Sequence, residues 1–184
     1  MRGVVFLVIV GLAFSAVCLA ADAPKMEIFG GYALFRADSS LTAMPNQIAN
    51  GWEASVTGNV NRFLGFTADF NGDYTSASTA GGNVTGHIHN FLFGPTVSYR
   101  TRRLTPFVHA LFGVSHLTGS TELAGTTTAS SSDNAFAMAL GGGFDVRINR
   151  LLAFRLAQLD YLRTQFSSTS QDNFRYSTGL VLRF

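Results

Sequence analysis

Strict alternation of apolar and polar residues recurs along most of this chain, and it limits the chain to folds built from strands. In the segment "GWEASVTGNVN", Trp52 and Val56 fall on one side, whereas Glu53 and Asn59 fall on the other. Residues two apart on a strand face the same way, so each run predicts a strand with one apolar and one polar face. No stretch keeps helical spacing over three turns. The eight predicted strands are residues 26–37, 50–62, 64–76, 87–100, 104–117, 134–148, 152–166 and 173–184.

Short and long connections alternate between these eight runs. The short ones are "NRFLGF", "YRTRRLTPF" and "NRLLAF", and most of the others are longer and rich in Ser, Thr, Gly and Asn. Outer-membrane barrels have an even number of strands, short periplasmic turns and longer external loops. The pattern therefore predicts an all-β fold, an eight-stranded antiparallel up-and-down transmembrane β-barrel in the bacterial cell outer membrane. Both ends of the mature chain are then expected on the periplasmic side.

The last run keeps its alternation as far as Phe184, whereas soluble domains usually end in polar, frayed residues. Tyr176, Leu180 and Leu182 share the parity of Phe184, and Arg175 lies on the opposite parity. In lipid, every backbone group must be paired within the protein, and only a closed sheet does this with strands. The last strand is therefore expected to pair with the first and to press its apolar face against the acyl chains.

The amino-terminal residues have the features of a secretory signal. A charged start is followed by an apolar stretch that is too short to span a membrane as a helix, and cleavage is expected after Ala20. The predicted organisation is a signal peptide over residues 1–20 and one outer-membrane barrel domain over residues 21–184. Cys18 leaves open a lipoprotein alternative, in which this thiol is lipidated, although residues 15–17 lack the usual motif.

The remaining composition narrows the partners and the chemistry. Cys18 is the only cysteine, so the mature chain is expected to have no disulfide, no thiolate nucleophile and no Cys-based zinc site. The arginines are scattered singly except in "RTRR", which differs from the clustered basic face of a protein that binds nucleic acid. For "RTRR" itself, contact with anionic lipid headgroups and simple solvation of a turn both stay open.

The polar faces of the strands are expected to fill the barrel, because eight strands enclose a space just wide enough for side chains. Acids and arginines together there would pair, since unpaired charges in a narrow lumen are costly. A plugged lumen is therefore favoured over an open pore. The predicted lumen residues are Glu53, Asp69, Asn90, His109, Asp145, Arg147, Asp160 and Arg175.

The seventh run does not keep one parity. Arg155 lies on the side opposite to Gln158 and Asp160, so a bulge is needed to bring all three inside the barrel. Without that bulge, Arg155 is expected near the periplasmic interface, with Gln158 and Asp160 inside.

The histidines favour structural positions over catalytic or metal sites. His109 and Ser115 share the inward parity but are six residues apart, about 20 Å along a strand, so they cannot touch. A contact between His109 and Asp145 would fit neighbouring strands, but a hydrogen-bonded interior histidine is the favoured interpretation. His87 and His89 share a face without an evident third ligand, which favours a position at the level of lipid headgroups. No enzymatic activity, cofactor or metal is therefore predicted.

The signal segment, "IFGGY" in the first strand, "GGGFDVR" and "RLAQLDY" in the sixth and seventh, and the terminal "GLVLRF" together resemble the OmpA-type family of small eight-stranded outer-membrane barrels. In that family, a carboxyl-terminal aromatic residue with apolar residues at alternate positions is read by the barrel assembly machinery. The resemblance implies this role for Tyr176, Leu180, Leu182 and Phe184, and it implies outer-membrane lipid as a partner. The family includes porin-like, adhesive and structural members, so the resemblance does not fix the activity.

The expected function is that of an integral outer-membrane barrel with a structural role or with contacts made by its external loops. Two alternatives stay open: a narrow porin-like channel for small solutes, and a secreted soluble barrel that binds an apolar ligand as lipocalins do. Conductance tests the first alternative, and extraction without detergent tests the second. The segment "TELAGTTTASSSD" shows no recognisable pocket or charge pattern, so the sequence does not identify the external partner.

Overall fold

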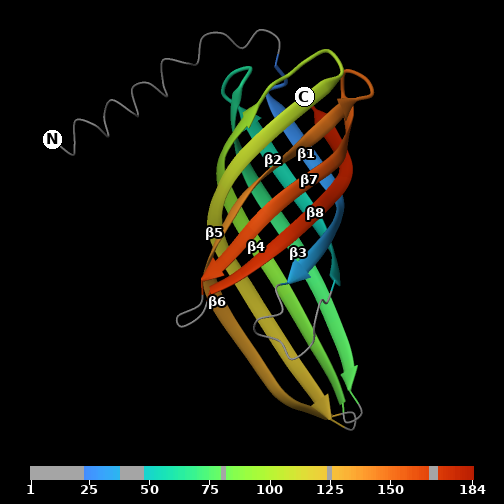
Figure 1. Ribbon diagram of the computed structural model, residues 1–184, viewed down its shortest axis with the longest axis vertical. Helices are drawn as coiled ribbons and strands as arrows, with labels where there is room; N and C mark the ends of the chain where they lie inside the picture. The colour runs from blue at the N-terminus through green and yellow to red at the C-terminus, as the bar shows by residue number, and fades with distance from the viewer. Residues whose placement is uncertain (1–22, 38–47, 80–81, 124–125, 166–169) are drawn as a thin grey trace, which may run out of the picture.

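The chain forms a closed barrel of eight antiparallel strands that are paired in chain order, as Figure 1 shows. The computed structural model describes residues 23–37, 48–79, 82–123, 126–165 and 170–184, so the expected signal peptide and its cleavage at Ala20 lie outside the described residues. The strands are β1 (Met26–Ala37), β2 (Ile48–Asn59), β3 (Leu64–Thr79), β4 (Gly82–Ser98), β5 (Leu104–Leu123), β6 (Thr126–Arg147), β7 (Leu152–Gln165) and β8 (Ser170–Arg183).

The barrel closes where β8 pairs with β1, in a register that runs from Glu27 opposite Arg183 to Ala37 opposite Asn173. Beyond the ends of the two strands, Phe184 N donates to Met26 O over 2.8 Å, and Met26 N donates to Phe184 O over 3.1 Å. The predicted pairing of the last strand with the first is confirmed. Closure leaves the transmembrane part of the sheet without an unpaired edge, as lipid requires.

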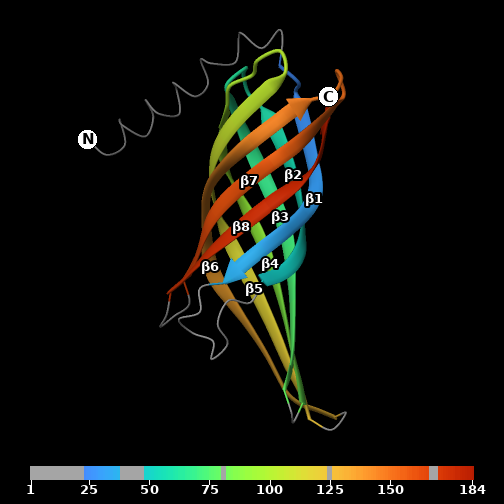
Figure 2. The same cartoon turned by 45° about the vertical axis from the view of Figure 1, so that its right-hand side comes forward.

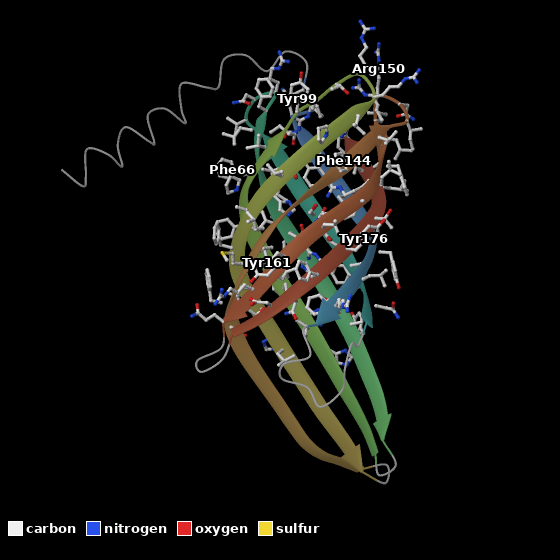
Figure 3. The ribbon with its side chains drawn as sticks, in the orientation of Figure 1. Phe66, Tyr99, Phe144, Arg150, Tyr161 and Tyr176 are labelled. Atoms are coloured by element: carbon white, nitrogen blue, oxygen red, sulfur yellow. The ribbon has the colours of Figure 1, made fainter. Side chains whose placement is uncertain are left out.

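The outward faces of the strands are apolar and the inward faces are largely polar. Phe66, Phe93 and Leu159 are 56%, 68% and 62% exposed, and Figure 3 shows Phe66 and Phe144 on the outside of the barrel. A soluble barrel needs the opposite arrangement, with a polar exterior, so the lipocalin-like alternative is wrong. None of the described residues forms a helix with the length and apolarity needed to cross a membrane.

Four strands extend further than the alternation predicted. Residues 77–79 continue β3 and residues 82–86 begin β4, and most of residues 118–133 belongs to β5 and β6, where long loops were expected. Figures 1 and 2 show these strands reaching well beyond the other four, at the end opposite to the carboxyl terminus. Thr-rich segments suit strands, and antiparallel pairing satisfies their backbone groups. The alternation is absent there because a sheet segment outside lipid has no need of an apolar face.

A bulge reverses the parity of β7. The register of β7 against β8 shifts between Arg155 and Gln158, and that of β6 against β7 shifts between Phe144 and Asp145. Arg155 therefore turns into the barrel together with Gln158 and Asp160, and all three are buried. The alternative position of Arg155 near the periplasmic interface is wrong.

Apolar side chains also occupy part of the inward face, which the polar parity did not predict. Phe35, Leu92, Leu111 and Leu162 form one buried cluster with three alanines, and Phe29, Ala153 and Val181 form another. A lumen this narrow is filled by side chains of either kind. The two apolar clusters therefore contribute to a packed interior that also holds the charged groups.

Candidate functional site

A buried arginine holds three carboxylates together inside the barrel. The side chain of Arg175, on β8, is 0% exposed. Its Nη2 donates to Asp160 Oδ2 over 2.6 Å, and its Nη1 donates to Asp69 Oδ1 over 3.1 Å. Its Nε also lies 3.4 Å from Glu53 Oε2. The guanidinium thus links strands β2, β3, β7 and β8 across the lumen. It also supplies the positive charge that these three buried carboxylates need.

The strand register explains this cluster. Asp160 and Arg175 are direct partners across β7 and β8. Neutral donors satisfy the remaining carboxylate oxygens: Gln158 Nε2 donates to Glu53 Oε1 over 2.8 Å, and Ser177 Oγ donates to Glu53 Oε2. Asp160 Oδ1 lies 2.8 Å from His109 Nε2. Every carboxylate in this cluster therefore has a charged partner and at least one further polar contact.

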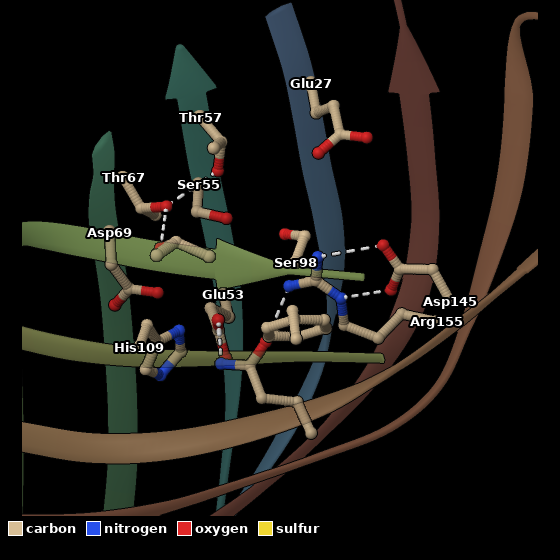
Figure 4. A pocket seen from close by; sticks show the side chains of 13 residues that line it. Glu27, Glu53, Ser55, Thr57, Thr67, Asp69, Ser98, His109, Asp145 and Arg155 are labelled. Atoms are coloured by element: carbon tan, nitrogen blue, oxygen red, sulfur yellow. Dashed lines mark hydrogen bonds and ion pairs between the residues drawn. The ribbon is translucent and has the colours of Figure 1, made fainter. Parts of the chain in front are cut away.

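A second buried arginine lies nearer the short-turn end of the barrel. Arg155 Nε donates to Asp145 Oδ1 over 2.8 Å, as Figure 4 shows. The guanidinium carbon lies 4.2 Å from the ring centre of Phe29 and 4.3 Å from that of Phe107. Two aromatic faces and a carboxylate thus surround this cation, so its charge stays stabilised away from water.

Two further ladders cross neighbouring strands inside the barrel. Asn90 Nδ2 donates to Asn71 Oδ1 over 2.6 Å, and Asn71 Nδ2 donates to Asp69 Oδ1 over 2.8 Å. The hydroxyls of Thr57, Thr67 and Thr96 form a chain with separations of 2.8 and 2.6 Å. Cross-strand polar pairs of this kind satisfy groups that water would otherwise have to solvate.

The structure brings seven of the eight predicted lumen residues into this interior network. Arg147 is the exception, because it is exposed at the end of β6, so its predicted lumen position is wrong. His109 contacts Asp160 rather than Asp145, which binds Arg155 and Arg183 instead. The residues that lie buried inside the barrel are Glu53, Asp69, Asn90, His109, Asp145, Asp160 and Arg175.

Arg100 and Phe107 belong to the network but were not among the predicted lumen residues. Arg100 follows β4, and its Nη2 reaches back to Glu27 Oε2 over 3.2 Å and to Asn59 Oδ1 over 2.9 Å. Phe107 provides an inward ring for Arg155. The parity of Phe107 with His109 was a usable signal for its position, whereas no local pattern marks the reach of Arg100 from a turn.

The cavities described inside the barrel are small. Two cavities of about 10 Å³ and about 20 Å³ lie between the lumen side chains, and a single water needs about 10–15 Å³ on the same scale. Each cavity therefore has room for about one water. Among the described residues, the lumen is filled by packed and hydrogen-bonded side chains.

The outward-facing histidines and the carboxyl-terminal residues lie on the surface of the barrel. His87 and His89 pack edge-on against Tyr74, with ring centres 5.2 and 6.1 Å away. In the part of the chain that the structure describes, no group of three or more His, Cys, Asp or Glu side chains could hold a metal ion. Leu180, Leu182 and Phe184 are 51%, 44% and 57% exposed. Tyr176 Oη donates to the carbonyl of Leu156 over 3.0 Å.

The strands β3 to β6 continue as a four-stranded sheet beyond the closed barrel. Their pairing runs to Thr79 opposite Gly82, to Gly82 opposite Leu123, and to Leu123 opposite Thr126. On the other side of β6, pairing with β7 begins only at Phe136 opposite Gln165. No described strand pairs with residues 126–133 on that side, so this part of β6 forms a backbone edge of the extension.

Comparison with known proteins places the chain among outer-membrane barrels. The family model for the outer membrane protein beta-barrel domain matches residues 6–184. Neisserial surface protein A has a similar structure, with a TM-score of 0.66, 16% identity, and coverage of 89% of this chain and 99% of that chain. Ail, the attachment invasion locus protein of Yersinia pestis, is similar with a TM-score of 0.65, 15% identity, and coverage of 89% of this chain and 100% of that chain.

The outer membrane protein OprG from Pseudomonas aeruginosa is also similar, with a TM-score of 0.53, 11% identity, and coverage of 90% of this chain and 98% of that chain. No curated protein matches the chain in sequence. At these identities, the structural likeness shows the fold alone. The family match extends over nearly the whole chain, and the chain therefore belongs to the outer membrane protein beta-barrel family as an integral outer-membrane protein.

Proposed function

We propose that this protein anchors an extracellular contact surface in the outer membrane, and that the four-stranded extension of β3 to β6 is this surface. The observation that carries the proposal is the edge of β6 over residues 126–133, with which no described strand pairs on one side. An unpaired strand edge presents a row of N–H and C=O groups that can pair with a strand of another chain. Residues 126–133 offer about 26 Å of such an edge.

The sequence of this edge supports the proposal. Residues 126–133 read "TTTASSSD", without proline and without lysine or arginine. Proteins commonly protect exposed edges with residues such as proline or lysine, because these residues discourage the addition of another strand. Their absence leaves the edge open to β-augmentation, in which backbone hydrogen bonds provide affinity and alternate side chains provide specificity.

The orientation that we propose places both mature termini in the periplasm and the extension outside the cell. The short turns and Phe184 lie at one end of the barrel, and the extension lies at the other, as Figure 1 shows. Outer-membrane barrels have short periplasmic turns and longer external segments, which supports this direction. A contact role outside the cell is also in keeping with the name of one structural neighbour, the attachment invasion locus protein.

The proposed role is neither enzymatic nor that of a channel. His109 is 5% exposed and already contacts Asp160, so it offers no accessible general base. The two small cavities in the lumen support a plugged interior over a solute path. Outer-membrane lipid and the barrel assembly machinery are the partners proposed for the barrel itself, the latter through Tyr176, Leu180, Leu182 and Phe184.

The test shortens the β5–β6 hairpin without disturbing the barrel. Gly119 lies opposite Ser131, so replacement of residues 120–130 by Asn-Gly closes the hairpin with a two-residue turn. Cells that display the full protein and cells that display this variant are both screened with a library of ten-residue peptides. Peptides enriched on the full protein should be lost from the variant, and they should slow amide exchange in residues 126–133. Equal enrichment on both cells, or protection of amides elsewhere, would contradict the proposal.

A further inference from the structure

The three short turns share one backbone arrangement. Asn61 Oδ1 accepts the N–H groups of Phe63 and Leu64, each over 2.8 Å. Asn149 Oδ1 accepts those of Leu151 and Leu152 over the same distances. In the remaining turn, Thr101 Oγ1 takes this capping position and accepts Leu104 N over 3.0 Å. The pattern is an Asn or Thr cap, an arginine, one further residue and a leucine.

The shared arrangement repeats an arginine at one position in every short turn. Arg62, Arg102 and Arg150 each follow the capping residue, and all three are exposed. Arg103 and Arg147 add two further exposed cations at the same end. Figure 3 shows Arg150 extending away from the end of the barrel. Capping fixes the turn backbone, so the arginines are held at a common level by the fold rather than by a loose loop.

The described side-chain carboxylates near this end are already neutralised by other arginines. Glu27 pairs with Arg100 over 3.2 Å and with Arg183 over 2.9 Å, and Asp145 pairs with Arg155 and Arg183. No described carboxylate forms an ion pair with the five exposed arginines. At the opposite end, by contrast, the exposed Arg163 lies 3.9 Å from Asp172. Among the described side chains, the charge of the short-turn end is therefore uncompensated and positive.

Exposed apolar side chains adjoin these arginines and connect them to the lipid-facing band. Phe63, Tyr99 and Leu151 are 42%, 59% and 62% exposed. The guanidinium carbon of Arg62 lies 4.6 Å above the ring centre of Phe63, and the rings of Phe63 and Tyr99 stack at 6.3 Å. Aromatic rings and snorkelling arginines of this kind mark the boundary between acyl chains and headgroups.

We propose that the arginines of the short turns form a binding surface for anionic phospholipid headgroups in the leaflet that this end faces. A guanidinium matches phosphate oxygens with two parallel hydrogen bonds, and basic side chains at a membrane surface attract anionic lipid. The uncompensated charge and the adjoining apolar rim together select a lipid as the occupant. This inference does not depend on the proposed role of the external sheet.

The test measures lipid preference of the mature protein in phosphatidylcholine vesicles that contain spin-labelled phosphatidylglycerol or spin-labelled phosphatidylcholine. The wild-type barrel should associate with phosphatidylglycerol about fivefold more strongly. Replacement of all five arginines by glutamine (Arg62, Arg102, Arg103, Arg147 and Arg150) should remove this preference. The matched control is Arg163→Gln at the other end, which should retain it. Heat-modifiable gel mobility verifies that each variant is folded.

Two measurements on the wild-type protein keep the test independent of variant folding. The preference should weaken as NaCl rises from about 50 mM to about 500 mM, because salt screens exposed charges. Phosphate and chloride should act equally at matched ionic strength. The inference is overturned if the variant with all five arginines replaced binds phosphatidylglycerol as the wild type does. It is also overturned if Arg163→Gln loses the preference equally, or if salt has no effect on the preference. Stronger displacement by phosphate than by chloride would also overturn it, since that result indicates a site for a free anion.

Discussion

Replacement of Arg175 by methionine should destabilise the barrel severely. The guanidinium is fully buried and contacts Asp160 over 2.6 Å, Asp69 over 3.1 Å and Glu53 over 3.4 Å. Methionine fills similar space but leaves three carboxylates in the lumen without this cation. Removal of one partner from a buried ion pair costs about 3–5 kcal/mol, and three acids share this partner. We therefore expect the free energy of unfolding to fall by at least about 3 kcal/mol.

The measurement is urea unfolding of the refolded protein in lipid vesicles, followed by tryptophan fluorescence. The chain has a single tryptophan, Trp52, which is 43% exposed on the outward face of β2 and so reports on contact with lipid. The control is Arg163→Met, because the pair of Arg163 with Asp172 is about half exposed and spans 3.9 Å. An exposed pair of this kind contributes about 0–1 kcal/mol.

A second substitution separates lost charge balance from lost packing. Asp160→Asn in the Arg175→Met background removes one of the uncompensated acids, so it should recover part of the lost stability. A loss below about 1 kcal/mol for Arg175→Met would refute the reasoning that the lumen charges depend on this arginine. Failure of Asp160→Asn to recover any stability would indicate that packing, rather than charge, sets the cost.

Three further predictions concern close packing, assembly and conductance. A Cβ at Gly113 would overlap the carbonyl oxygen of Phe91, whereas one at Gly30 meets open space; Gly113→Ala should cost about 1–3 kcal/mol and Gly30→Ala almost nothing in the same urea assay. Phe184→Ala should lower the amount of folded barrel in cells, as judged by gels of outer-membrane fractions, while the stability of protein refolded in vitro changes by less than about 2 kcal/mol. Wild-type protein in planar bilayers should give no steady openings, and steps of reproducible size would show that the lumen conducts.

The closed barrel was predictable because lipid imposes a strong and regular constraint on each strand. Side chains such as Phe66 and Phe93 must face acyl chains, and their inward neighbours must fit a narrow interior, so alternation marks both the strands and their faces. Outside the membrane, that constraint is absent. Residues 77–86 and 118–133 were therefore expected to be loops, although most of them form paired strands.

The partners inside the lumen depend on register, which local patterns do not encode. Parity predicted that Glu53 and Arg175 face inward, but their approach across β2 and β8 follows from the curvature of the closed sheet. The bulge in β7 reverses the side of Arg155. Arg147 shares the parity of Asp145 yet lies where the strand ends, so it is exposed to solvent rather than enclosed. Parity thus predicts the face of a residue but neither its depth nor its partner.

The most direct test of the account compares unboiled and boiled mature protein on a denaturing gel, together with its distribution between outer-membrane and periplasmic fractions. Backbone closure between β1 and β8 and a packed lumen should keep the barrel folded in detergent until it is heated. We predict an unboiled band with altered mobility, found in the outer-membrane fraction. Identical mobility before and after boiling, with the protein in the periplasmic supernatant, would contradict a closed, lipid-facing barrel.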